Sequence, residues 1–166
     1  FLVISSAKEP ERRLQPLTAP DGPTIFGVDV EQLKPDTAAI INATSRGFPQ
    51  ENLRDLPAGD YTVQAVLNVY TTFPRADGHT IKAHMDQWEG QQWNTSPGNL
   101  VTEPQKIHFD PGRSSPVRLT FARALPPIDP PPDSKYVRHL KFKSEILSRW
   151  WGREINLGAV VLLPDG

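Results

Sequence analysis

The ten residues Tyr61-Thr62-Val63-Gln64-Ala65-Val66-Leu67-Asn68-Val69-Tyr70 are the clearest structural signal in this chain. Apolar positions recur at every second residue, namely Tyr61, Val63, Ala65, Leu67 and Val69. The residues between them are polar or amphipathic, except Val66. A period of two predicts a β-strand with one face packed against a core and the other in water.

The sequence on both sides of this run continues the pattern. Further strands are predicted at Phe1–Ser6, Thr24–Val30, Thr37–Thr44, Glu103–Asp110, Val117–Leu125, Lys135–Lys143 and Ile155–Leu163. Asp77-Gly78 is typical of a hairpin turn, and Phe48–Leu56 and Ser144–Trp151 suit short helical or irregular segments. Lys8–Pro23 is polar and holds four prolines, so we expect an extended loop on the surface.

Short strands separated by turn residues, with almost no helical periodicity, predict an all-β fold. The natural architecture is an immunoglobulin-like or fibronectin-like β-sandwich with a C-terminal extension. Pro126–Pro132 contains five prolines and should form a stiff, extended linker. We therefore predict a β-sandwich domain at 1–125, a linker at 126–134 and a C-terminal strand segment at 135–166.

Composition excludes several classes of function. The net charge of −1 offers no basic face for nucleic acid, and no run approaches the length of a membrane span. Cysteine is absent, which removes disulfides, thiolate nucleophiles and cysteine zinc sites. The sequence opens at Phe1 inside an apolar run, as it would after removal of the leader of an exported protein, or where an ordered region begins within a longer protein. We expect a secreted or periplasmic location.

Two stretches carry a family resemblance. One runs from Ile25-Phe26-Gly27-Val28-Asp29-Val30 to Leu56-Pro57-Ala58-Gly59-Asp60-Tyr61, and the other from Tyr70-Thr71-Thr72-Phe73-Pro74-Arg75-Ala76-Asp77-Gly78 to Met85-Asp86-Gln87-Trp88-Glu89-Gly90. Both resemble the β-sandwich region that precedes the catalytic domain in bacterial esterases of the enterochelin-esterase and esterase-D type, within the α/β-hydrolase superfamily. The tail Ile155–Gly166 is similar to the opening strand of such a catalytic domain.

The resemblance implies an accessory module rather than a complete enzyme. An esterase domain needs a Gly-x-Ser-x-Gly motif followed by an acid and a histidine, and no such motif occurs in this sequence. We therefore carry over no catalytic residue. The partner implied is a hydrolase domain of the same polypeptide, following Gly166.

The richest local chemistry lies between His79 and Asn99. Aromatic rings stack on sugars while amides and carboxylates bond hydroxyl groups, so this stretch predicts a carbohydrate-type ligand site. The candidate ligand-binding residues are His84, Asp86, Trp88, Glu89, Trp93 and Asn94. The competing interpretation is that the tryptophans pin a long loop onto the sandwich or onto the following domain.

Other constellations in the sequence are weaker. His79, His84 and Asp86 are residue types that bind zinc, but His79 and His84 would not share a face of a strand, and we predict no metal site and no cofactor. The run Arg149-Trp150-Trp151-Gly152-Arg153 is expected to pack at the junction between the modules.

The sequence leaves three functions open. The first is a non-catalytic accessory β-sandwich module of an exported esterase-like hydrolase. The second is a stand-alone carbohydrate-binding module, which requires Trp88 and Trp93 to be exposed and coplanar. The third is a structural or self-assembling extracellular protein that uses unpaired strand edges.

Overall fold

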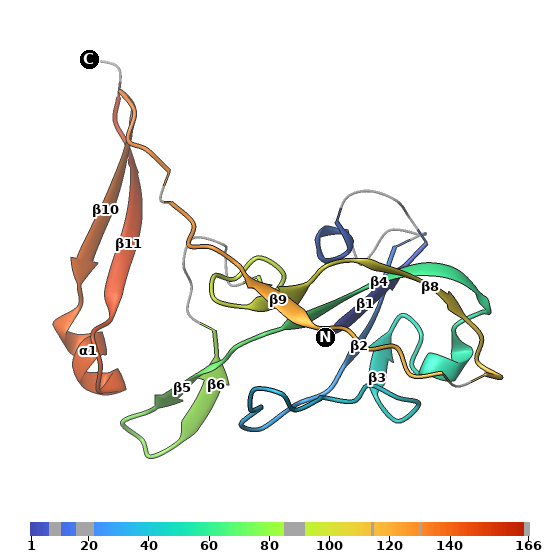
Figure 1. The fold of residues 1–166 in the computed structure, drawn as a ribbon. Coiled ribbons are helices and arrows are strands. Elements are labelled where there is room, and N and C mark those ends of the chain that lie inside the picture. The colour runs from blue at the N-terminus through green and yellow to red at the C-terminus, as the bar shows by residue number, and fades with distance from the viewer. Residues whose placement is uncertain (7–10, 16–21, 85–91, 114, 130, 165–166) are drawn as a thin grey trace. The chain divides into compact units, whose positions relative to one another are not determined.

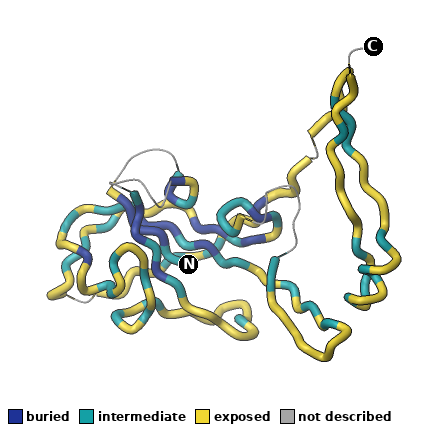
Figure 2. The backbone as a smooth tube through the Cα atoms, turned by 180° about the vertical axis from the view of Figure 1, so that it is seen from behind, coloured by how far each residue is buried: buried dark blue, intermediate teal, exposed yellow. Residues whose placement is uncertain are grey.

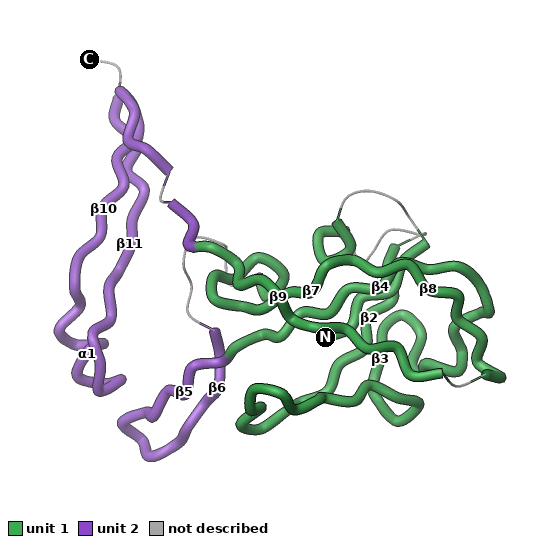
Figure 3. The backbone as a smooth tube through the Cα atoms, in the orientation of Figure 1, with its two compact units in different colours: residues 1–69, 92–126 green, residues 70–91, 127–166 purple. Residues whose placement is uncertain are grey.

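The structure is a computed structural model, and it describes residues 1–6, 11–15, 22–84, 92–113, 115–129 and 131–164. The chain forms two compact units. Unit 1 holds Phe1–Val69 and Gln92–Pro126, and unit 2 holds Tyr70–Gln91 and Pro127–Gly166 (Figure 3). Unit 2 is thus built from two pieces of chain, one of which is inserted between the halves of unit 1. The predicted domain bounds stay a prediction, because compact units are not the same as independently folding domains.

Strands hold 37% of the described residues and helices 9%, and every sheet is antiparallel, which confirms the all-β class. The immunoglobulin-like sandwich stays a prediction.

Unit 1 contains one seven-stranded sheet, in the order β3-β2-β1-β4-β7-β9, with β8 also paired to β4 (Figure 1). Its strands are β1 (Leu2–Ser5), β2 (Thr24–Gly27), β3 (Arg46–Phe48), β4 (Gly59–Leu67), β7 (Leu100–Thr102), β8 (Gln105–Phe109) and β9 (Phe121–Ala124). Two 3₁₀ turns accompany them, η1 (Arg12–Leu14) and η2 (Leu53–Asp55). The central strand of the sheet is therefore the one that the alternating sequence predicted.

One edge of β4 is shared by two successive strands. Val66 pairs with Val101 of β7, whereas Val63 pairs with Gln105 of β8, so four residue steps lie opposite three. The extra residue falls at Glu103-Pro104, where the missing N–H of proline leaves no ladder donor unsatisfied. This irregularity divides what would be one strand into β7 and β8.

Both faces of β4 are covered, which corrects the prediction of one wet face. Val63, Ile4, Phe26 and Leu56 form an apolar cluster on one side. On the opposite side, Gln64 and Val66 are both 0% exposed, and Val66 packs with Val101 and Leu125. A buried glutamine is tolerated there because its amide is hydrogen-bonded.

A close approach explains one glycine of the sheet. Gly47 of β3 pairs with Phe26 of β2, and a Cβ at Gly47 would collide with the Phe26 ring and with the carbonyl oxygen of Gln50. The ring therefore lies directly on the backbone of the neighbouring strand.

Two predictions for unit 1 are wrong. Thr37–Thr44 is not a strand: Asp36 has a φ of 61°, the Asn42 side chain accepts a hydrogen bond from the Thr44 N–H, and Ile40 is exposed. These local turns compete with sheet pairing. Within the predicted loop Lys8–Pro23 the structure describes residues 11–15 and 22–23, and there the chain is not an extended surface loop, because Arg12–Leu14 form η1 and Arg12 is buried; the rest of that prediction lies outside the described residues.

Unit 2 contains two hairpins. One is formed by β5 (Thr71–Pro74) and β6 (Thr80–Ala83), with Gly78 at a φ of 85° in the predicted turn. The other pairs β10 (Val137–Lys143) with β11 (Asn156–Leu162) over their whole length, and helix α1 (Glu145–Trp151) connects them. The Ser144 hydroxyl caps α1 by accepting from the Leu147 N–H, and Gly152 ends it with a φ of 66°.

Candidate functional site

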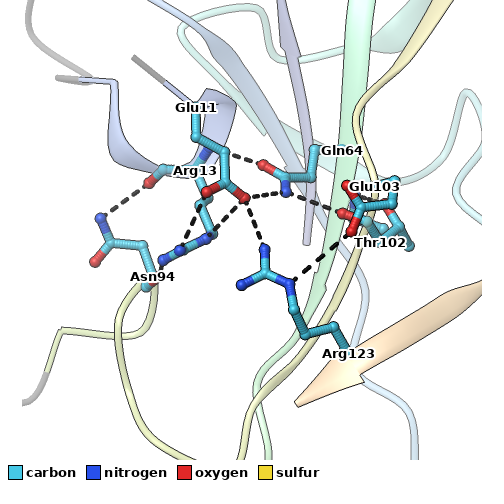
Figure 4. Close-up of polar contacts among 8 residues, drawn as sticks. Glu11, Arg13, Gln64, Asn94, Thr102, Glu103 and Arg123 are labelled. Atoms are coloured by element: carbon cyan, nitrogen blue, oxygen red, sulfur yellow. Dashed lines mark hydrogen bonds and ion pairs between the residues drawn. The ribbon is translucent and has the colours of Figure 1, made fainter. Parts of the chain in front are cut away.

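A polar cluster lies on the Gln64 face of the unit 1 sheet, and we call it the Glu11 cluster. Its members are Glu11, Arg13, Gln64, Asn94, Thr102, Glu103 and Arg123 (Figure 4). They come from η1, β4, β7, β9 and the loops beside them, so the cluster joins segments that are distant in sequence.

Gln64 is the centre of the Glu11 cluster. Its Nε2 donates to the Glu11 Oε1 at 2.5 Å and to the Thr102 carbonyl at 3.0 Å, and its Oε1 accepts from the Arg13 N–H at 3.2 Å. These bonds satisfy the polar atoms of a fully buried side chain. They also fix η1 against β4 and β7.

The Glu11 carboxylate is held by two guanidinium groups. Arg13 binds both carboxylate oxygens, each at 3.2 Å, and Arg123 lies 3.4 Å from Oε1. Burial raises the pKa of Glu11, but the hydrogen bonds of Gln64 and Arg13 and the charges of Arg13 and Arg123 outweigh burial and leave the pKa below its ordinary value. A carboxylate engaged in this way is a structural anchor rather than a proton acceptor.

The Glu11 cluster predicts acid sensitivity of unit 1. Since the folded-state pKa of Glu11 is lowered, its stabilising contribution is present above the ordinary value of 4.5 and is lost as the pH falls through the folded pKa. We expect the free energy of unfolding to fall below about pH 4.5, and Glu11→Gln to flatten that part of the curve. Urea unfolding between pH 7 and pH 3, followed by circular dichroism, measures both. An equally steep decline in Glu11→Gln would contradict this assignment.

The described part of the predicted ligand site is engaged in internal contacts. Trp93 packs on the apolar cluster of Val66, Val101 and Leu125 in unit 1. Its ring centroid lies 4.8 Å from that of Phe1. The Asn94 side chain donates to the Arg13 carbonyl at 2.9 Å, and the Asn94 carbonyl accepts from the Arg13 guanidinium. Through these contacts, both residues hold their loop against the rest of unit 1.

Of the other predicted ligand residues, the structure describes His84. His84 follows β6 and belongs to unit 2, where it is half-buried. Asp86, Trp88 and Glu89 lie outside the described residues. The exposed, coplanar pair of tryptophans therefore stays a prediction, and the ligand site with it.

A groove of about 750 Å³ lies on unit 1 beside β4 and β8. Its described lining residues are Ser6, Arg12, Asp60, Tyr61, Thr62, Lys106, Ile107 and His108. Within it, the Nδ1 of His108 lies 2.6 Å from the Asp60 carboxylate, as a cross-strand pair of β4 and β8. The hydroxyl, ammonium and carboxylate groups that line this groove are of the kinds that bind a polar ligand. The Asp60 and His108 side chains are exposed, and an ordinary surface ion pair accounts for their contact without a ligand.

A second histidine, His139, anchors the end of the proline-rich segment to β10. The Asp133 carboxylate accepts from the His139 backbone N–H at 2.8 Å and lies 3.2 Å from its ring nitrogen. These bonds to His139 and the nearby Arg138 charge lower the pKa of Asp133.

Among the described residues, no three histidine, aspartate or glutamate side chains come together as metal ligands. Within the same part of the chain, no helix has the length and apolar character needed to cross a membrane.

The most unusual surface lies on the β10–β11 hairpin. Neither of its strands has a buried residue: β10 is half-buried at Val137–His139 and exposed over the rest of its length, and β11 is exposed except at Val161 (Figure 2). Paired residues of an antiparallel ladder point to the same side, so Leu140, Phe142, Leu157 and Ala159 share one face. Val160 and Leu162 lie on the other face, and both are exposed.

The chain was compared with protein-family models, with curated proteins and with solved structures, and none of the three comparisons finds a match.

Proposed function

We propose that this chain is a non-catalytic accessory module of an exported esterase-like hydrolase, and that 135–166 forms the start of the hydrolase domain. The observation that carries the proposal is the β10–β11 hairpin, which exposes apolar side chains on both faces. Phe142 on one face is 54% exposed and Val160 on the other is 59% exposed. An isolated two-stranded hairpin is marginal in water, and one with two apolar faces needs cover on both.

The two strands of this hairpin differ in a way that supports the proposal. β10 carries Arg138, Lys141 and Lys143, whereas β11 has no charged residue. Charged side chains are typical of sheet edges, and strands that are apolar on both faces are typical of sheets with layers on both sides. β10 then suits the edge of a larger α/β sheet and β11 its interior, in agreement with the resemblance of Ile155–Gly166 to an esterase opening strand.

Unit 1 is the proposed immunoglobulin-like sandwich of this module. Its strands are all antiparallel, and β4 forms three ladders, one with β1 along one edge and one each with β8 and β7 along the other. A strand shared in this way can pass from one sheet of a sandwich to the other. The carbohydrate-binding alternative gains no support from Trp93, because that ring packs against Phe1.

The first test is the native polypeptide. We expect a mass well above 18.5 kDa and hydrolysis of short p-nitrophenyl esters that a serine-directed inhibitor abolishes, while the 166-residue chain shows no hydrolysis. A native mass equal to that of this chain would overturn the proposal, as would a longer polypeptide without ester hydrolysis.

The same proposal predicts opposite effects of one substitution in two settings. Val160→Glu in the 166-residue chain should reduce self-association of the chain and its binding of a hydrophobic dye, because the substitution places a charge on an exposed apolar face. In the longer polypeptide it should lower the free energy of unfolding by about 2 kcal/mol or more, because the charge would be buried. Analytical ultracentrifugation and thermal unfolding measure the two. The matched control is Lys141→Glu on β10, for which neither effect is expected. A neutral Val160→Glu in the longer polypeptide would contradict burial of this face.

A further inference from the structure

The two hairpins of unit 2 meet at one aromatic residue. Phe73 lies in β5, which is inserted between β4 and β7 along the chain. Its ring centroid is 5.6 Å from that of Trp151 at the end of α1, with the rings at 75°. The guanidinium carbon of Arg153 lies 4.7 Å from the centroid of the same ring. All three side chains are half-buried.

Both contacts have favourable geometry. An edge-to-face arrangement directs the positive edge of one ring at the negative face of another, and a guanidinium close to a ring is attracted by the same quadrupole. Phe73 thus uses its ring in two ways, and an aliphatic side chain would reproduce neither.

The β5–β6 hairpin presents one face to this contact. Phe73 pairs with Ile81 and Thr71 pairs with Ala83, so these four share a face. Thr71, Phe73 and Ala83 on that face are half-buried, whereas Thr72 and Lys82 on the other face are exposed. The turn is closed by the Arg75 N–H, which donates to the His79 carbonyl, and by the ion pair of Arg75 with Asp77 at 2.7 Å.

The turn after α1 fixes the other half of the contact. Gly152 adopts the left-handed conformation, and the N–H groups of Gly152 and Arg153 both donate to the Ser148 carbonyl. The Ser148 hydroxyl accepts from the Ile155 N–H at 2.9 Å. The backbone between Trp151 and Arg153 is therefore held in one conformation.

We infer that the β5–β6 hairpin is an intramolecular docking arm for the β10–α1–β11 segment, with Phe73 as its positioning residue. The proline-rich stretch joins this segment covalently to the chain before it. The contacts of Phe73 with Trp151 and Arg153 add a second, non-covalent connection through the β5–β6 hairpin. Opening of one hairpin is then coupled to opening of the other. The inference goes beyond the proposed function, in which the same arm would hold the beginning of the hydrolase domain.

The test is hydrogen exchange of the 166-residue chain, followed by mass spectrometry. In Phe73→Ala we expect exchange of peptides covering 145–162 to be about tenfold faster, since one ring pair and one cation–π contact are lost. Exchange in β4 should not change. Phe73→Leu keeps apolar contact but not the π-face, and should give a smaller increase in the same peptides.

Two further variants make the test specific. Trp151→Ala should speed exchange in 71–83, because coupling between two elements is reciprocal. Thr72→Ala, on the exposed face of the same strand, should leave 145–162 unchanged. Unaltered exchange of 145–162 in both Phe73 variants would overturn the inference, and so would an equal increase in Thr72→Ala. If Phe73→Ala disturbs β4 as well, Phe73→Leu and Trp151→Ala decide. Since no hydrolase domain is needed, failure here is distinct from failure of the proposed function.

Discussion

Replacing Phe26 by alanine is expected to lower the free energy of unfolding of unit 1 by about 3–5 kcal/mol, the largest effect of any single substitution considered. Phe26 is 0% exposed and lies in the apolar cluster with Ile4, Leu56 and Val63. Its ring also rests on the Gly47 backbone, where no side chain can move in to fill the cavity. Urea unfolding followed by circular dichroism measures the loss.

The matched control for Phe26→Ala is Phe142→Ala, the same truncation at an exposed position of unit 2. In the 166-residue chain Phe142→Ala should lower the free energy of unfolding by less than about 1 kcal/mol, because folding removes little of the apolar surface of Phe142 from water. If the two variants lose similar free energies of unfolding, Phe26 is not more deeply buried than Phe142, which would contradict the structure.

Replacing Gln64 by leucine is expected to lower the free energy of unfolding by about 2–4 kcal/mol, although leucine is the more hydrophobic side chain. The substitution keeps the volume approximately but removes the amide that binds Glu11, Arg13 and Thr102. It leaves the Thr102 carbonyl and the Arg13 N–H without that partner in a buried place. Burying unsatisfied polar groups costs more than the added apolar contact contributes.

Gln64→Leu should also raise the pKa of Glu11 towards its ordinary value, since one of the hydrogen bonds that lower it is lost. The control is Gln105→Leu, at an exposed position of β8, which should be nearly neutral. Measuring urea unfolding of the two variants at pH 7 and pH 4 separates the packing effect from the charge effect. A Gln64→Leu variant as stable as the parent chain would refute the central role of this amide.

The candidate site shows where residue type is informative and where it is not. The sequence singled out Trp93 and Asn94 because aromatic and amide groups suit a ligand site. The structure places both on internal partners: Phe1 lies 92 positions from Trp93 in the chain, and Arg13 lies 81 positions from Asn94. Residue type states what a side chain can bind, whereas tertiary structure decides which group is near enough to be bound.

The Glu11 cluster was missed for the same reason. Glu11 and Arg13 lie in a polar, proline-rich stretch that is typical of a surface loop, and Gln64 occupies a polar position of an alternating strand. Nothing local indicates that they meet. The one sequence signal was the interrupted alternation at Val66, which reflects the second covered face of β4.

The sequence by itself determined the all-β class, the strand that becomes β4, the Asp77-Gly78 turn and the two strands of the last segment, because these follow from side-chain period and local turn conformation. Only the tertiary structure decided that Gln64 is buried, that Thr37–Thr44 is not a strand, that β10 pairs with β11, and that Phe73 contacts Trp151 and Arg153. Those outcomes depend on hydrogen bonds and ring contacts between residues far apart in the chain. Such contacts form only when the whole fold brings the partners together, so no local pattern encodes them.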